Sequence, residues 1–411
     1  MAERLSANPS RAVRLTIWVG AAIAAVAWAA FVLRPSLHAD TYAFSACYGA
    51  ARLVIETPGH PDLYGEGLAE TQRRAGLVTD RLGPFPPTLA LVMVPIAWLP
   101  ARVARPVWLS LDLLMLAAIV WLAGRLASAR PDPLYWPAAI IVLSLHQPLA
   151  FEVANGQVYT LVALVYTVWL WAWLERRETL GGAALAALLL LKLSGWPLWV
   201  LAIWRRRFRV VAWGVAWALA AVVVSWPLLG LRAWRAFVTD ALPSLAGNPA
   251  QASTAYQTLR SALGQMLDFD PRWSPAPLVD APLAAAGVWI ALATGLLWMT
   301  FRRTTPGGLR EALATLCLVV PLQPAGGQHH YLILAAAWLA VLRTGGGLVF
   351  TRATRVMVVV ALGLFALPPY FLAPDLTGWR WALVAYPRVA AALLLWAALV
   401  VGRRSPEHAC A

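Results

Sequence analysis

A series of long, uninterrupted apolar runs constrains this chain more than any other feature of its sequence. They cover Leu15–Leu33, 104–124, 134–151, 158–174, 180–204, 209–230, 279–301, 310–325, 328–342, 355–373 and 380–402. A helix needs about 20 mostly apolar residues to cross a bilayer, whereas the strands of a β-barrel alternate polar and apolar residues. Charged residues are only 13% of the 411, about half of their share in soluble domains. The sequence therefore predicts an all-α polytopic integral membrane protein with about 12 transmembrane helices.

The chain is strongly basic, and the distribution of its charge indicates orientation in a membrane. The formal net charge is +14, and the basic residues form short clusters at the ends of the apolar runs. A nucleic-acid-binding protein carries a continuous basic patch instead, so no nucleic-acid partner is expected. Because basic loops favour the cytoplasmic side, Arg11 and Arg14 predict a cytoplasmic N-terminus. Arg403 and Arg404 likewise predict a cytoplasmic C-terminus, in a multi-pass protein of the cell membrane.

The apolar runs form one predicted transmembrane domain, 1–411, with two long polar interruptions. Residues 34–103 are expected to form a first outer loop with amphipathic or re-entrant segments, and 231–278 a second outer loop, because both mix Pro, Gly, charged and aromatic residues. Within the first loop, Pro84–Pro100 is apolar but short and contains Pro95. This segment either re-enters or lies at the interface, or it spans the membrane; the sequence leaves both open.

Two topologies with twelve spans follow from that choice. If Pro84–Pro100 does not span, the run 180–204 is best described as two antiparallel helices, 180–191 and 194–204, joined by an outer turn at Lys192. In the rival topology this run is one helix and the lysine lies at mid-membrane, where a charge is costly.

We prefer the first topology, because Ser194, Gly195 and Pro197 are poor residues for a continuous helix. It places Arg102 and Arg105 outside, against the basic-loop preference.

Asp40 lies just beyond the first apolar run and is followed by the aromatic Tyr42. A partly desolvated carboxylate at the lipid–water boundary has a raised pKa and can act as a general base toward a sugar hydroxyl. The same residue suits the N-cap of a helix that begins near Thr41, and both interpretations stay open.

Asn155 and Gln157 flank Gly156 between two apolar runs. Their amide groups both donate and accept hydrogen bonds, which suits sugar or phosphate oxygens, and a glycine permits close backbone approach. An ordinary outer turn is the alternative.

Lys192 is the only lysine in the chain. Its ammonium group either pairs with a lipid phosphate or extends toward the headgroups.

His329 and His330 open a later run from the outer side. A helix N-terminus favours anions, and an imidazole hydrogen-bonds phosphate. Adjacent histidines on a helix point about 100° apart and no third ligand is apparent, so no metal site is predicted. Arg260, in the second outer loop, could pair with phosphate through its planar guanidinium, or it is a structural surface residue.

Asp112 and Glu152 are expected to be mainly structural acids near the bilayer. Three scattered cysteines, Cys47, Cys317 and Cys410, indicate neither a disulfide framework nor a zinc site. Phosphate-binding, dinucleotide-binding and nucleophile-elbow motifs are absent from the sequence. A sugar donor, if the protein uses one, would therefore arrive through the membrane.

The order of several short motifs resembles glycosyltransferase family 87, the integral-membrane GT-C enzymes typified by polyprenol-phosphate-mannose-dependent α-mannosyltransferases. The motifs are Asp40-Thr41-Tyr42-Ala43-Phe44, Ala50-Ala51-Arg52-Leu53, Asp62-Leu63-Tyr64, Phe85-Pro86-Pro87, Gly156-Gln157-Val158, Lys192 with Pro197 behind it, and His330-Tyr331. Two positions depart from the family pattern: Thr41 stands where a second aromatic residue is common, and Pro197 is further from Lys192 than usual.

The resemblance implies a GT-C-type fold and an inverting transfer of mannose. The donor would be polyprenyl-phosphate-mannose and the acceptor a glycolipid or lipoglycan on the outer side of the cell membrane. The product would be an α-mannoside, with an α-1,2 linkage by analogy. Asp40 would be the base, while Lys192, His330, His329 and Arg260 would hold the leaving phosphate. Tyr42, Gln157 and Asn155 would contact substrate.

Such enzymes use no cofactor and usually no metal. Their other partners are membrane lipids, and the sequence is silent on oligomeric state. The alternatives are a secondary transporter or lipid-linked sugar flippase, although no inverted repeat is apparent, and a catalytically inactive protein with a family-like fold.

Overall fold

The computed structural model describes residues 10–37, 41–126, 133–246, 249–342, 348, 350–368, 378–380 and 384–402. In this part of the chain the regular structure is helical, and the only β-type pairings are two isolated bridges, Tyr256 with Gly327 and Asp270 with Ser274. The predicted all-helical class is confirmed. The elements are α1 (Arg11–Trp28), η2 (Ala29–Leu33), α2 (Arg34–Ser36), α3 (Tyr42–Glu56), α4 (Glu66–Arg74), η3 (Pro87–Ile96), α5 (Ala101–Arg125), α6 (Tyr135–Leu145), α7 (Gln147–Asn155), α8 (Tyr159–Leu174), α9 (Glu178–Lys192), α10 (Trp196–Trp204), α11 (Phe208–Ala236), η4 (Phe237–Ala241), α12 (Pro243–Ala246), η5 (Pro249–Ala252), α13 (Leu259–Leu267), α14 (Pro282–Arg303), α15 (Leu309–Val319), η6 (Gln328–Leu334), α16 (Ala335–Val341), α17 (Arg352–Ala366) and α18 (Pro387–Val401).

Four helical segments among the described residues are long and apolar enough to cross a membrane: Arg11–Ser36, Ala101–Arg125, Phe208–Leu245 and Pro282–Arg303. A fifth candidate is the pair α6 and α7, which is bent by 65° at the break between them. Pro148 in the first turn of α7 cannot donate a helical hydrogen bond, which accounts for a break there. The predicted count of about 12 spans is not confirmed, because many apolar runs fold into helices shorter than a bilayer crossing.

The run around Lys192 forms a helical hairpin, as the preferred topology predicts. Helix α9 ends at Lys192 and α10 begins at Trp196, with Leu193 and Gly195 both in the left-handed region at φ 48° and 85°. The Ser194 N–H donates to the Leu188 carbonyl, which closes the end of α9. Glycine adopts this conformation at no steric cost, so Gly195 explains where the chain reverses.

The ambiguous segment Pro84–Pro100 contains a short 3-10 helix, η3 (Pro87–Ile96). Ten residues of 3-10 helix extend about 20 Å, less than the roughly 30 Å of hydrocarbon in a bilayer. Its buried residues pack against α3, and the Thr88 hydroxyl donates to the Leu190 carbonyl at 2.5 Å. The segment is therefore attached to the end of α9, and this supports the topology in which it does not span.

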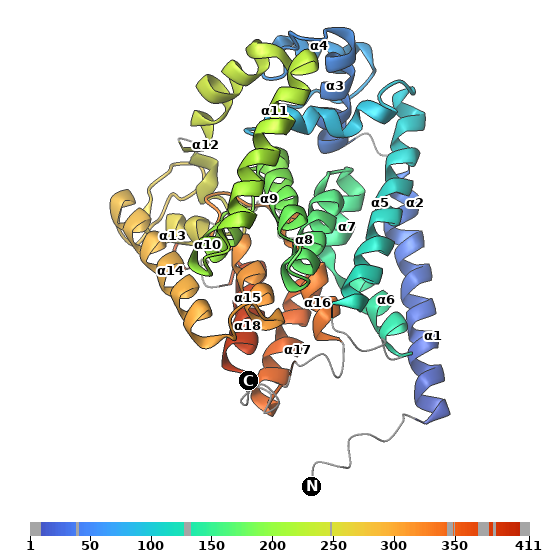
Figure 1. Ribbon diagram of the computed structural model, residues 1–411, viewed down its shortest axis with the longest axis vertical. Coiled ribbons are helices and arrows are strands. Elements are labelled where there is room, and N and C mark those ends of the chain that lie inside the picture. The colour runs from blue at the N-terminus through green and yellow to red at the C-terminus, as the bar shows by residue number, and fades with distance from the viewer. Residues whose placement is uncertain are drawn as a thin grey trace.

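Helix α11 continues beyond the predicted end of its apolar run at residue 230. A kink at Gly230, with φ 61°, redirects the helix, which runs on through Ala236 and into η4. The Gly59 N–H donates to the Leu228 carbonyl at 2.8 Å, and a side chain at Gly230 would collide with the Gly59 carbonyl. The first part of the predicted second outer loop is thus helical and packs against α3, at the end of the structure where α3 and α4 lie (Figure 1).

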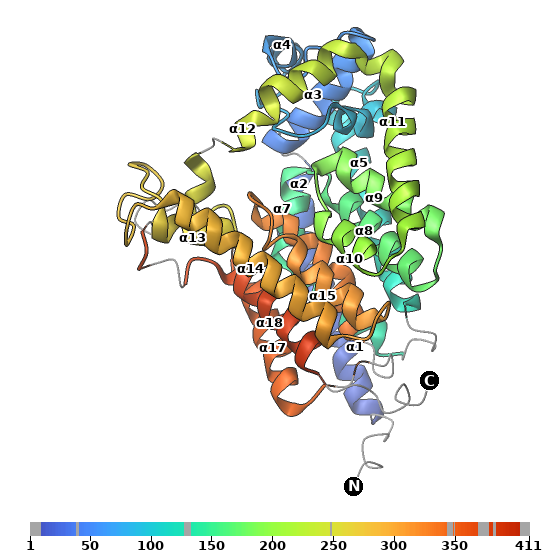
Figure 2. The ribbon, with the colours of Figure 1, turned by 60° about the vertical axis from the view of Figure 1, so that its left-hand side comes forward.

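Two large apolar cores organise the described part of the molecule. The larger one joins α5 to α10 with α14 to α18, and the smaller one joins α3, η3, the start of α5 and the end of α11. Figures 1 and 2 show α3 and α4 at one end of the structure, with the main bundle of helices below them.

The basic loops meet at one end of the bundle, which we call the basic end: residues 174–178, 204–208 and 301–309. Arg205 donates to the Glu311 carboxylate at 2.7 Å and to the Phe301 carbonyl at 2.7 Å, and Arg209 lies 3.7 Å from Glu178. Helix α9 starts at this end and its 15 residues carry the chain about 22 Å away, to Lys192. Lys192 and the basic end therefore lie at opposite ends of α9.

Candidate functional site

The turn Asn155-Gly156-Gln157, between α7 and α8, forms one wall of the candidate site. Gly156 adopts a left-handed conformation at φ 62°. A Cβ atom there would lie 2.8 Å from Arg105 Nη1 and 2.9 Å from the Cβ of Phe44. Both the backbone conformation and the close approach require glycine at this position.

Two buried charged side chains hold this turn from opposite sides. Arg105 Nη2 donates to the Val153 carbonyl at 2.7 Å, at the end of α7. Glu152 Oε1 accepts from the backbone N–H groups of Tyr159 at 2.5 Å and Thr160 at 3.2 Å, at the start of α8. A cation at a helix C-terminus and an anion at an N-terminus are both favourable.

The turn is therefore held by charge and hydrogen bonds together. Arg105, which runs against the basic-loop preference in the predicted topology, is explained by this contact: its side chain is 3% exposed and binds a helix end.

Thr41 brings the chain that follows the first helix to the same turn. Its hydroxyl donates to the Asn155 carbonyl at 2.5 Å. Asp40 itself lies outside the described residues, so its predicted role as base stays a prediction, but the residue after it is at the turn. Tyr42, the first residue of α3, is 63% exposed, so its ring is accessible rather than part of the core.

Lys192 contacts the ring of Tyr159, two residues after this turn, and lies in an aromatic environment. Its side chain is 6% exposed, and Nζ is 3.7 Å from the ring centroid of Phe85 and 5.1 Å from that of Tyr159. Cation–π contacts of this kind stabilise an ammonium by about 0.5 to 2 kcal/mol. Within the described parts of the chain, no carboxylate lies within ion-pair distance of it. The ammonium group is thus buried with partial compensation for its lost hydration, which favours binding of an anion.

The two histidines complete the site. The ring centroid of Tyr159 is 4.9 Å from that of His329 and 4.2 Å from that of His330, and the His329 ring also stacks on Phe151 at 5.8 Å. The Nδ1 atoms of both imidazoles are buried and make no hydrogen bond within the protein. Both histidines therefore offer hydrogen-bonding capacity to a ligand. The described residues contain no group of three His, Cys, Asp or Glu that could hold a metal ion.

Tyr159 is the residue through which these side chains meet, since its ring contacts Lys192 and both histidines. We call the group the Lys192 cluster; its members are Phe85, Tyr159, Lys192, His329 and His330. Asn155 and Gln157 belong to the neighbouring turn, where the Asn155 amide donates to the Phe151 carbonyl at 2.8 Å. Gln157 is half-buried, and its carbonyl accepts from the Trp108 indole N–H at 3.2 Å.

Arg260 has a partner within the second loop, which favours the structural one of the two roles that the sequence left open. Its Nη1 donates to Asp268 Oδ2 at 2.6 Å, so its guanidinium is engaged within the second loop. The loop itself does reach the site, because the Gln257 N–H donates to the Gly326 carbonyl at 2.8 Å, three residues before His329. Arg260 therefore belongs to the loop that borders the site rather than to the Lys192 cluster.

Sequence reasoning gave no role in the site to three supporting residues, Phe85, Tyr159 and Arg105. Phe85 stands in the Phe85-Pro86-Pro87 motif, which was used only for the family resemblance, and Tyr159 lies two residues beyond Gln157. Glu152 was taken as mainly structural; its contacts confirm that, and they show that the structure it supports is the wall of the site. No local pattern marks Arg105, since its partners are backbone carbonyls about 50 residues away.

Comparison with known families adds an independent finding. The model of glycosyltransferase family 87 matches residues 84–324, more than half of the chain. The chain belongs to this family. Comparisons with curated proteins and with solved structures found no match. The matched region of this family-87 member contains Phe85, the Asn155-Gly156-Gln157 turn and Lys192, and it ends just before His329. With its apolar helices, the protein is a membrane glycosyltransferase.

Proposed function

We propose that this glycosyltransferase transfers mannose from polyprenyl-phosphate-mannose to a glycolipid or lipoglycan acceptor, with inversion at the anomeric carbon and formation of an α-mannoside, α-1,2 by analogy. The observation that carries the proposal is the buried ammonium of Lys192, which has aromatic neighbours but no carboxylate partner among the described residues. The ring of Tyr159 contacts this ammonium and also the imidazoles of His329 and His330. That arrangement suits the phosphate of a lipid-linked donor.

In the proposed reaction the acceptor oxygen attacks the anomeric carbon as the bond to the donor phosphate oxygen breaks. Asp40 takes the acceptor proton, and polyprenyl phosphate leaves with the bonding electron pair. A phosphate monoester is a weakly basic leaving group, so one carboxylate is enough. Lys192, His329 and His330 stabilise the charge that develops on the phosphate.

Asn155, Gln157 and Tyr42 are proposed to bind the sugars. The hydrogen bond from the Thr41 hydroxyl to the Asn155 carbonyl supports this assignment, because it ties the residue after Asp40 to the turn that leads into Tyr159, whose ring contacts Lys192. Neither a cofactor nor a metal ion is needed for this scheme, since the phosphate charge is met by side chains of the chain itself.

The reaction is proposed to take place on the extracytoplasmic side. Basic loops favour the cytoplasm, and the basic end lies at the other end of α9 from the Lys192 cluster. With this orientation, a multi-pass chain with cytoplasmic termini exposes residues 34–103 and 231–278 outside.

A donor panel tests the proposal. Purified protein in lipid nanodiscs would receive radiolabelled polyprenyl-phosphate-mannose, polyprenyl-phosphate-glucose or GDP-mannose, together with mixed membrane glycolipids as acceptors. We expect transfer from the first donor only, and release of the label by an α-mannosidase but not a β-mannosidase. Transfer from GDP-mannose, or a β-linked product, would contradict the proposal.

A further inference from the structure

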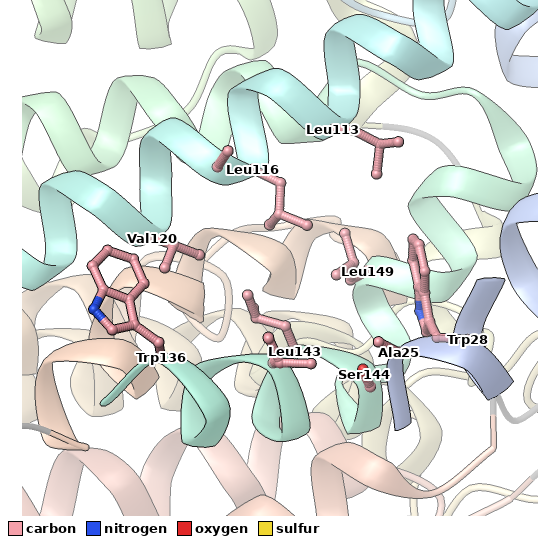
Figure 3. Close-up of a pocket in the computed structure, with 11 residues that line it drawn as sticks. Ala25, Trp28, Leu113, Leu116, Val120, Trp136, Leu143, Ser144 and Leu149 are labelled. Carbon is pink, nitrogen blue, oxygen red and sulfur yellow. The ribbon is translucent and has the colours of Figure 1, made fainter. Parts of the chain in front are cut away.

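An apolar groove opens between α1, α5 and α6, as Figure 3 shows. Its volume is about 350 Å³. Leu116 of α5, Leu143 of α6 and Trp28 of α1 face this hollow from three sides, and Ser144 supplies one of its few polar atoms. The groove is thus shaped by side chains from three helices that are distant in sequence.

The helices that form this groove are candidate membrane spans. Helix α1 belongs to the segment Arg11–Ser36, α5 is the segment Ala101–Arg125, and α6 is the first half of the bent pair. The surroundings of the groove are therefore hydrocarbon, where the available ligand of matching chemistry is the apolar chain of a lipid.

A second hollow of about 290 Å³ continues the groove along the same seam. It is lined by Phe31 and Val32, which follow α1, and by Ala150 and Phe151 of α7. Leu149, which lines the first hollow, immediately precedes Ala150 in the same helix. The two hollows therefore follow one line between the first helix and the α6–α7 pair, which we call the α1–α7 seam.

The α1–α7 seam leads to the Lys192 cluster. Phe151 lines the second hollow and stacks on His329, and Ala154, which also lines it, directly precedes Asn155. Ala25 in the first hollow is eleven residues before Ser36 in the second, a helical distance of about 16 Å. An apolar chain that lies in the seam would have its polar end beside the buried imidazoles.

We propose that the α1–α7 seam binds the hydrocarbon tail of the lipid-phosphate sugar donor while the donor phosphate lies at the Lys192 cluster. The assignment of the tail to the donor rests on the proposed function. Because lipid tails are as apolar as the groove, the affinity of the seam for a tail comes from the fit and van der Waals packing of the tail in the groove and not from hydrophobicity. Holding the tail in the seam also orients the anomeric carbon toward the acceptor.

The test fills the groove and uses a matched control on the same helix. Ala25→Trp places a large ring in the first hollow, whereas Ile23→Trp places the same ring about 200° around α1, on a side chain that is 64% exposed. Transfer would be measured with a long polyprenyl-phosphate-mannose and with an analogue that carries a single isoprene unit, too short to reach Ala25.

We expect Ala25→Trp to raise KM for the long donor about tenfold and to leave KM for the short donor unchanged. The control variant Ile23→Trp should have the wild-type KM for both donors. An unchanged KM for the long donor with Ala25→Trp would overturn the inference. If Ala25→Trp lowers the thermal stability and the amount of co-purified phospholipid but not the donor KM, the seam holds bulk lipid instead.

A second measurement does not depend on transfer and so separates the two proposals. Wild-type protein would be irradiated with a long-chain polyprenyl phosphate that carries a diazirine at the tail end, and the labelled peptides would be mapped. Labels on α1, α5 and α6 support the seam even if mannose transfer is absent. Labels spread evenly over the lipid-facing helices would overturn the inference whatever the transfer assay gives.

Discussion

Replacing Lys192 with methionine separates a phosphate-binding lysine from a structural one. Methionine has nearly the same length, keeps apolar contact with Phe85 and Tyr159, and removes the buried charge. If the ammonium stabilises charge on the leaving phosphate, its loss should lower kcat/KM by about 100- to 1,000-fold, as the removal of one preorganised charge-stabilising donor does. The folded protein should lose little stability, because the desolvation cost of an ammonium without a described carboxylate partner disappears as well.

A purely structural lysine predicts a loss of stability and no loss of kcat/KM. If the lysine serves only to stack on the two rings, Lys192→Met should lower the free energy of unfolding by the cation–π contribution, about 0.5 to 2 kcal/mol. Activity would then change only with the amount of folded protein. Transfer rates in nanodiscs and thermal unfolding of the same samples distinguish the cases, with Lys192→Arg as a variant that keeps the charge. A kcat/KM within threefold of wild type for Lys192→Met would refute the phosphate role.

Three further predictions concern the surroundings of the cluster. Gly156→Ala should destabilise the protein by at least 1 to 2 kcal/mol, because the left-handed backbone and the contact with Arg105 exclude a Cβ; a thermal unfolding temperature equal to that of wild type would contradict this. Arg260→Ala should reduce transfer less than threefold, since its guanidinium is engaged by Asp268; a loss of the size expected for Lys192→Met would place it at the phosphate instead. Burial raises the pKa of the Cys47 thiol to about 11, and Lys192 opposes the shift. The thiol is therefore protonated at pH 7.5, and a maleimide should modify Cys47 only after the protein unfolds. Rapid labelling of the folded protein, detected by mass spectrometry of the α3 peptide, would contradict the burial of Cys47.

Features of the sequence that act locally were predictable. The break after Lys192 follows from Ser194, Gly195 and Pro197, and the structure places the turn within one residue of the end predicted for the first helix. Gly156 was expected to allow a close backbone approach, and it does. In each case the chain conformation is decided by residues within a few positions.

Features that depend on distant contacts were not predictable. Arg105 appeared to conflict with the topology until its bond to the Val153 carbonyl showed that it binds the end of α7. Apolar runs long enough to suggest spans fold into short helices such as α15 and α16, because hydropathy cannot distinguish burial in protein from burial in lipid. The sequence left two roles open for Arg260, because no local pattern marks its ion pair with Asp268, eight residues on at the end of the same helix α13.

The most direct test of the proposed reaction is the effect of Asp40→Asn on mannose transfer. The amide cannot accept the acceptor proton, and a general base contributes about 100- to 10,000-fold to a rate. Asp240→Asn is the matched control, since Asp240 is exposed in η4, in the second loop, away from the cluster. At equal levels of folded protein, we predict that Asp40→Asn loses at least 100-fold in transfer from polyprenyl-phosphate-mannose while Asp240→Asn keeps the wild-type rate. An Asp40→Asn variant with wild-type transfer would contradict the account, because the acceptor would then be deprotonated by another group.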